Sequence, residues 1–101
     1  MANDSILLVQ LDASPTSRTF YYFNNVDASI AEVLAIYERR LKQLNPTIPQ
    51  ISYTLQDIYG FIEKSPEFGV LVFEPKIKAF IPHDKFWIKE KVAARIQRNL
   101  K

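Results

Sequence analysis

The chain has 101 residues, a length that fits one domain with one hydrophobic core. Hydrophobic residues make up 48% and aromatic residues 13% of the chain, which is too rich a composition for disorder. Cysteine is absent, which excludes a disulfide framework, a thiolate metal site and a cysteine nucleophile. The net charge of +2 is too small to indicate a nucleic-acid-binding protein by itself.

No stretch approaches the roughly 20 apolar residues that a membrane span needs. Residues 6–11 form too short an apolar run for a secretory signal and lack a basic flank. We therefore expect residues 1–101 to form a single domain of an intracellular, soluble protein.

The first predicted strand covers residues 5–11. Successive side chains of a strand point to opposite faces, so Ile6 and Leu8 share one face while Leu7 and Val9 share the other. A half-buried strand would alternate apolar with polar residues. This strand is instead apolar on both sides and needs cover on both.

The second predicted strand covers residues 18–23, which are mostly aromatic. Aspartate, serine and proline in residues 12–17 predict the loop before it. The short connection indicates an antiparallel hairpin.

A long helix is predicted next, because residues 30–44 carry apolar side chains at helical spacing. It should end at Asn45, since a proline follows. Ser29 forms a capping-box pattern with the glutamate three residues later, while Asn25 and Asp27 are rival N-caps.

A shorter amphipathic helix follows, with Thr54 as its cap, Asp57 as the capping-box partner and a stop at Ser65. Residues 68–73 predict a third strand that is again apolar on both faces. Residues 74–76 predict a turn.

A fourth strand is predicted over residues 77–82, and Asp84 can cap a final helix. The apolar stripe of that helix is formed by Ile88, Val92, Ile96 and Leu100.

The element order ββααββα predicts an α+β fold, with a four-stranded antiparallel sheet and three helices on one of its faces. The other face would then be bare, although the first and third strands carry apolar residues on both sides. A contiguous apolar face of that size indicates an interface. The simplest cover is a second copy related by a two-fold axis, and we expect a homodimer.

Residues for catalysis do not form a recognisable set. His83 is the only histidine, and we interpret it as a capping or surface residue rather than a base. The carboxylates are scattered singly, and Gly60 and Gly69 do not form a phosphate loop. We expect no enzyme activity, no metal site and no cofactor.

Direct RNA binding is the alternative function. Aromatic residues of the second strand, together with Arg18, could stack bases, but the motif and element order of the RNA-recognition fold are missing. Residues 85–101 are the basic part of the chain, so the alternative would use the final helix.

Two positions have competing interpretations as partner-binding residues. Trp87 shares its helix side with Lys91 and Arg98, so it is either an exposed anchor on a basic patch or a residue that packs over the preceding loop. Ile36 lies beside Arg40 and either flanks a groove for a partner segment or forms the edge of the core.

The whole chain resembles the enhancer of rudimentary family. The features that carry the resemblance are, in chain order, Ile6-Leu7-Leu8-Val9-Gln10, Arg18-Thr19-Phe20 with Phe23, Tyr37-Glu38, Leu41-Lys42, Asn45-Pro46-x-x-Pro49-x-Ile51-x-Tyr53, Phe61-Ile62, Leu71-Val72, Pro82-x-x-Lys85 and Trp87-Ile88-Lys89-Glu90-Lys91.

The resemblance implies an α+β domain that forms homodimers through its sheet face and has no known enzyme activity. Ile6 and Leu8 match family positions at the dimer interface. We expect that interface to comprise Ile6, Leu8, Gln10, Val70 and Val72.

The resemblance also implies an adaptor that binds short segments of RNA-processing proteins. The processes served in the family include messenger RNA decay, splicing, microRNA processing and, in nematodes, piRNA biogenesis. The expected location is the nucleus, cytoplasmic perinuclear RNA granules, or both.

Departures from the family pattern affect expected control by phosphorylation. The acidic residue that often follows the position of Thr19 is replaced by Tyr22, and a second phosphosite aligns with Asn25. These changes indicate an altered partner surface, as in a specialised germline paralogue. We expect partner binding to involve Tyr22 together with Ile36, Arg40 and Trp87.

Overall fold

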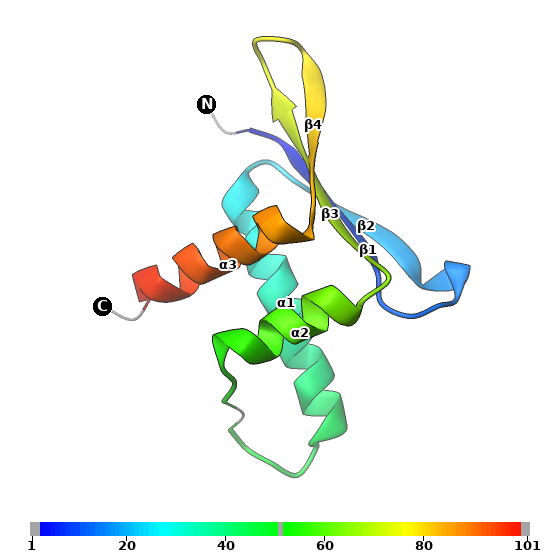
Figure 1. Ribbon diagram of the computed structural model, residues 1–101, viewed down its shortest axis with the longest axis vertical. Coiled ribbons are helices and arrows are strands. Elements are labelled where there is room, and N and C mark those ends of the chain that lie inside the picture. The colour runs from blue at the N-terminus through cyan, green and yellow to red at the C-terminus, as the bar shows by residue number, and fades with distance from the viewer. Residues whose placement is uncertain (1–2, 51, 100–101) are drawn as a thin grey trace.

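The computed structural model describes residues 3–50 and 52–99 and contains one sheet and three α-helices (Figure 1). The strands are β1 (Ser5–Gln10), β2 (Arg18–Phe23), β3 (Glu67–Glu74) and β4 (Ala79–His83). The helices are α1 (Val26–Leu44), α2 (Leu55–Lys64) and α3 (Lys85–Asn99), with a short 3₁₀ turn at Pro15–Ser17. The predicted α+β class and the element order are confirmed.

The four strands pair in the order β2-β1-β3-β4, and every pair is antiparallel. The two hairpins are therefore joined edge to edge by β1 and β3, which form the centre of the sheet. Leu7 lies opposite Val70 in this register, while Leu8 lies opposite Gly69. Because directly opposed residues share a face, the register assigns every strand residue to one side of the sheet.

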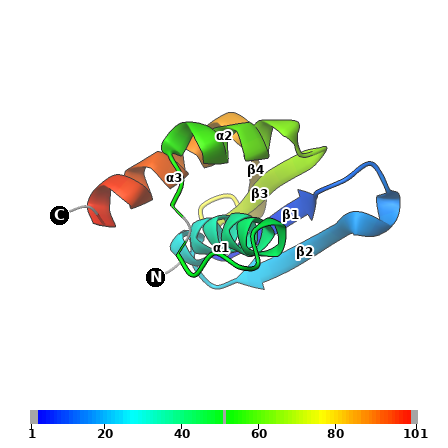
Figure 2. The same cartoon turned by 90° about the horizontal axis from the view of Figure 1, so that it is seen from below.

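The helices cover one side of this sheet. Helix α1 packs over β1 and β2, α3 packs over β3 and β4, and α2 lies against both α1 and α3 (Figure 2). Strand residues from this side and apolar helix residues are almost completely buried together. This core comprises Leu7, Val9, Ile30, Val33, Ile36, Tyr37, Ile58, Ile62, Phe68, Val70, Ile88 and Val92.

Of the three rival N-caps predicted for α1, the structure uses Asn25 rather than Asp27 or Ser29. The Oδ1 of Asn25 accepts a hydrogen bond from the backbone N–H of Ala28 at 2.7 Å. Ser29 is buried within the helix, and its Oγ lies 2.5 Å from the Oγ of Ser5 in β1. The capping box at Ser29 was therefore wrong, because this hydroxyl joins the helix to the sheet.

The other helix boundaries were predicted correctly. The N-cap Thr54 and Asp57 form the reciprocal capping box of α2, and α1 ends before Asn45. The carboxylate of Asp84 accepts from the backbone N–H of Trp87 at 3.0 Å at the start of α3. Of the predicted α3 stripe, Leu100 lies outside the described residues, as does Ile51 of the family pattern.

The fourth strand begins later than predicted. The turn after β3 extends over residues 75–78 and includes Lys78, whose φ of 54° lies in the left-handed region. Ile77 therefore belongs to the turn and is exposed. The strand starts at Ala79 and ends at His83, one residue beyond the predicted end.

Two of the expected interface residues lie on the wrong side of the sheet for that role. Val70 is fully buried opposite Leu7, and Val72 lies opposite Ser5 and packs against the core. Both belong to the helix-covered side. Leu71 is the β3 residue that shares a side with Ile6, its direct partner in the register.

Replacing Leu7 with alanine should lower the free energy of unfolding by about 2–5 kcal/mol, because its fully buried side chain would leave a cavity in the core. Leu44→Ala is the matched control, since Leu44 is 68% exposed and should cost less than about 0.5 kcal/mol. Urea denaturation at one protein concentration measures both values. Equal losses would contradict the placement of the core.

Leu71→Arg and Val70→Arg place the same charge on neighbouring positions of β3. Val70→Arg should prevent folding, because the guanidinium would enter the core without a partner. Leu71→Arg should keep native secondary structure, since its side chain points away from the helices. Circular dichroism with thermal melting distinguishes the two, and a folded Val70→Arg protein would contradict the register.

Candidate interaction surfaces

The side of the sheet that faces away from the helices is mostly apolar, and we call it the outer sheet face. The register assigns to it Ile6, Leu8, Gln10, Arg18, Phe20, Tyr22, Glu67, Gly69, Leu71, Phe73, Phe80 and Pro82. Phe20 is 68% and Tyr22 58% exposed, although both are large aromatic residues. The predicted bare apolar face is thus present within the described residues.

Polar groups lie at one end of the outer sheet face. The Oε1 of Gln10 accepts from the Nε of Arg18 at 2.8 Å, and its Nε2 donates to the backbone oxygen of Asp12 at 3.0 Å. Glu67 lies directly opposite Gln10 on β3. Gln10 therefore shares the face with Ile6 and Leu8, as expected, but its amide is already hydrogen-bonded within the chain.

Tyr22 lies at the other end of this face. Its hydroxyl donates a hydrogen bond to the carboxylate of Asp4, which raises the pKa of Tyr22 above its ordinary value. The hydroxyl and carboxylate form a polar margin beside the apolar centre. Such an arrangement, with an apolar middle and polar ends, is typical of a protein interface.

The four expected partner-binding residues do not form one surface. Ile36 is only 5% exposed and belongs to the core, as its interpretation as a core-edge residue expects, while its position beside a partner groove stays a prediction. It does line a hollow of about 150 Å³ between α1 and β2, together with Tyr21 and Arg40. Tyr22 lies on the opposite side of β2, and Trp87 lies on α3.

Trp87 packs back onto the residues before its helix. Its ring stacks on the ring of His83 with centroids 4.1 Å apart and planes 19° apart. The ammonium of Lys91 lies 5.4 Å from the Trp87 ring centroid, within range of a cation–π interaction. The interpretation that Trp87 packs over the preceding residues is therefore confirmed, while its role in partner binding stays a prediction; the most exposed aromatic residue here is Phe86.

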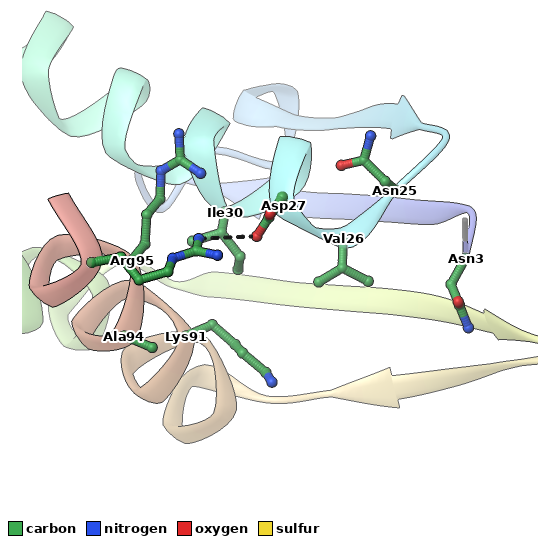
Figure 3. Close-up of a pocket in the computed structure, with 9 residues that line it drawn as sticks. Asn3, Asn25, Val26, Asp27, Ile30, Lys91, Ala94 and Arg95 are labelled. Carbon is green, nitrogen blue, oxygen red and sulfur yellow. Dashed lines mark hydrogen bonds and ion pairs between the residues drawn. The ribbon is translucent and has the colours of Figure 1, made fainter. Parts of the chain in front are cut away.

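A cleft that the sequence did not reveal lies between the start of α1 and α3, and we call it the basic cleft (Figure 3). Its volume is about 470 Å³. It is lined by Asn3, Asn25, Val26, Asp27, Ile30, Lys91, Ala94, Arg95 and Arg98. The three basic residues of the cleft recur at helical spacing on α3, and this spacing can be read from the sequence. Their position beside α1 depends on tertiary packing and could not be predicted from that spacing.

One ion pair crosses the basic cleft. The Nη2 of Arg98 lies 3.4 Å from the Oδ1 of Asp27, which links α3 to the first turn of α1 (Figure 3). Both side chains are more than half exposed, so the pair contributes little to stability. Arg95 forms no ion pair among the described residues.

Among the described residues, no group of three or more histidine, aspartate or glutamate side chains could hold a metal ion. None of the helices described is both long and apolar enough to cross a bilayer.

Comparison with known proteins identifies the family to which this chain belongs. The family model described as enhancer of rudimentary matches residues 1–101. An enhancer of rudimentary homolog from Arabidopsis thaliana is 34% identical over 94 residues, covering 93% of this chain and 86% of the relative. The protein enhancer of rudimentary from Drosophila virilis is 36% identical over 88 residues, covering 87% of this chain and 85% of the relative. A homolog from Caenorhabditis elegans is 26% identical over 88 residues, covering 87% and 85%. This chain therefore belongs to the enhancer of rudimentary family.

Proposed function

We propose that the protein is a homodimeric adaptor without enzyme activity that binds short peptide segments of RNA-processing proteins. The observation that carries the proposal is the outer sheet face, where Phe20 and Tyr22 are exposed beside Ile6 and Leu8. Its apolar residues come from all four strands. Exposed apolar patches of this kind mark sites of association.

A second copy of the chain is the occupant that fits this face best. Two sheets can pack face to face about 10 Å apart with their side chains interdigitated. Ile6 and Leu8 lie on β1, near the middle of the sheet, so a two-fold axis there would bring both copies of each residue into the interface. The polar residues Gln10, Arg18 and Glu67 would lie towards its edge.

The adaptor role follows from the side of the molecule that sheet-to-sheet association would leave exposed. Sheet-to-sheet association would cover the outer sheet faces and leave the helices of both copies exposed. Two equivalent partner sites could then hold two peptide segments, and linked segments would gain avidity. The hollow between α1 and β2, with Tyr21 and Arg40, is one such surface on the helix side.

The partner class and the location rest on the resemblance to the family. RNA-processing and small-RNA proteins are the proposed sources of the peptide segments, with messenger RNA decay, microRNA processing or piRNA biogenesis as the process. The corresponding location is the nucleus or perinuclear RNA granules.

Leu8→Arg should convert a dimer into a monomer or an aggregate. Burial of such a side chain contributes about 1.5–3 kcal/mol, and symmetry removes two copies at once. Analytical ultracentrifugation at micromolar concentration measures the change, with circular dichroism to check that the variant is folded.

Gln56→Arg is the matched control for Leu8→Arg, because it adds the same charge on the exposed side of α2. It should leave the molecular mass measured by sedimentation equal to that of the wild type. A wild-type protein that sediments as a monomer would contradict the proposed homodimer, whatever the behaviour of Leu8→Arg.

A further inference from the structure

We propose that the basic cleft between the start of α1 and α3 binds an acidic peptide segment with apolar side chains. This proposal deepens the adaptor function above and rests on it. It assigns a site and a partner chemistry to the helix side of the molecule.

The basic residues of α3 form two groups, one that contacts α2 and one that lines the basic cleft. Lys85 donates to the backbone oxygens of Glu63 at 3.1 Å and Ser65 at 2.6 Å, so it is bound to the end of α2. Lys89 forms an ion pair with the carboxylate of Glu63. Both lysines are thereby used in joining α3 to α2, and neither lines the cleft.

The remaining basic residues of α3 line the basic cleft. They are Lys91, Arg95 and Arg98, and the one acidic residue there is Asp27. Asp27 is already paired with Arg98, while Arg95 has no ion pair among the described residues. The cleft therefore carries an excess of positive charge, to which the N-terminal end of α1 adds the partial positive charge of its dipole.

The amide side chains at the cleft are engaged in the fold. The Nδ2 of Asn3 donates to the backbone oxygen of Phe73 at 3.0 Å, and Asn25 caps α1. The ammonium of Lys91 lies over the Trp87 ring, and Lys91 is an exposed residue with no ion pair among the described residues. The groups available to a ligand are therefore cationic donors, which select carboxylates.

The apolar side chains that line the basic cleft, which form its apolar floor, favour a peptide over RNA as the ligand. Val26, Ile30 and Ala94 line the cleft together with the basic residues, and none of its nine lining residues is aromatic. Single-stranded RNA is bound by stacking its bases on aromatic side chains, which this cleft lacks. A peptide that alternates carboxylate and aliphatic side chains would match both the charges and the floor.

The position of the cleft is compatible with the proposed dimer. It lies on the helix side of the molecule, whereas the outer sheet face is on the opposite side of the sheet. Each copy in a dimer would keep its cleft open. The cleft is also separate from the hollow at Ile36, with which it shares no lining residue.

The test is a nuclear magnetic resonance titration of the ¹⁵N-labelled full chain with a short synthetic peptide of glutamate, leucine and serine. A peptide with lysine in place of glutamate and a single-stranded RNA oligonucleotide are the comparison ligands. The acidic peptide should shift the backbone signals of residues 26–30 and 91–98. Arg95→Glu should weaken this binding about tenfold, because it replaces an attraction with a repulsion.

Lys42→Glu makes the same charge change at an exposed residue at the far end of α1 and should leave the affinity within about twofold of wild type. Equal weakening by Lys42→Glu and Arg95→Glu would overturn the proposal, since only overall charge would then matter. Binding of the RNA at these residues without binding of the acidic peptide would overturn it as well, and so would the absence of any shift.

Sedimentation of the same samples distinguishes this proposal from the adaptor proposal. A wild-type dimer that does not bind the acidic peptide would overturn the cleft assignment alone. A wild-type monomer that binds the peptide at residues 26–30 and 91–98 would support the cleft assignment and contradict the homodimer.

Discussion

The apolar character of β1 on both of its faces is the constraint on which the rest of the structure depends. Leu7 and Val9 are almost completely buried and hold the helix layer against the sheet. Ile6 and Leu8 point the other way, where the described chain supplies no helix. A strand in the centre of the sheet with this pattern stabilises the monomer with one face, and its other face contributes apolar side chains to the proposed dimer interface.

The alternation of side chains along a strand explains both what the sequence predicted and what it missed. In β1 the sides were assigned correctly, because Ile6 and Leu8 also matched the family pattern. In β3 every residue from Val70 to Phe73 is apolar, so no polar residue marks which side faces the helices. The assignment needs the pairing of Leu7 with Val70, a contact between residues far apart in the chain.

Helix ends show the same division between local and long-range causes. Thr54 and Asp57 cap α2 through contacts within one turn, so the sequence was sufficient to identify them. Ser29 has the same kind of local pattern, but its hydroxyl meets Ser5 of β1 and the helix begins earlier, after Asn25. A buried hydroxyl needs a hydrogen-bond partner, and here the tertiary contact prevailed over the capping pattern.

The two candidate surfaces lie on opposite sides of the sheet, an arrangement that is compatible with the proposed adaptor function. The outer sheet face depends on residues of the strands alone, whereas the basic cleft depends on α1 and α3, whose ion-paired residues Asp27 and Arg98 are far apart in the chain. The basic residues of α3 were visible in the sequence as a charged segment, but the partner chemistry depends on the neighbouring helix. Val26 and Ile30 give the cleft an apolar floor that a charged helix alone would not have. In the proposed adaptor, association through the strand layer would leave the chemistry of the helix layer unchanged, so dimerisation and peptide binding could be varied independently.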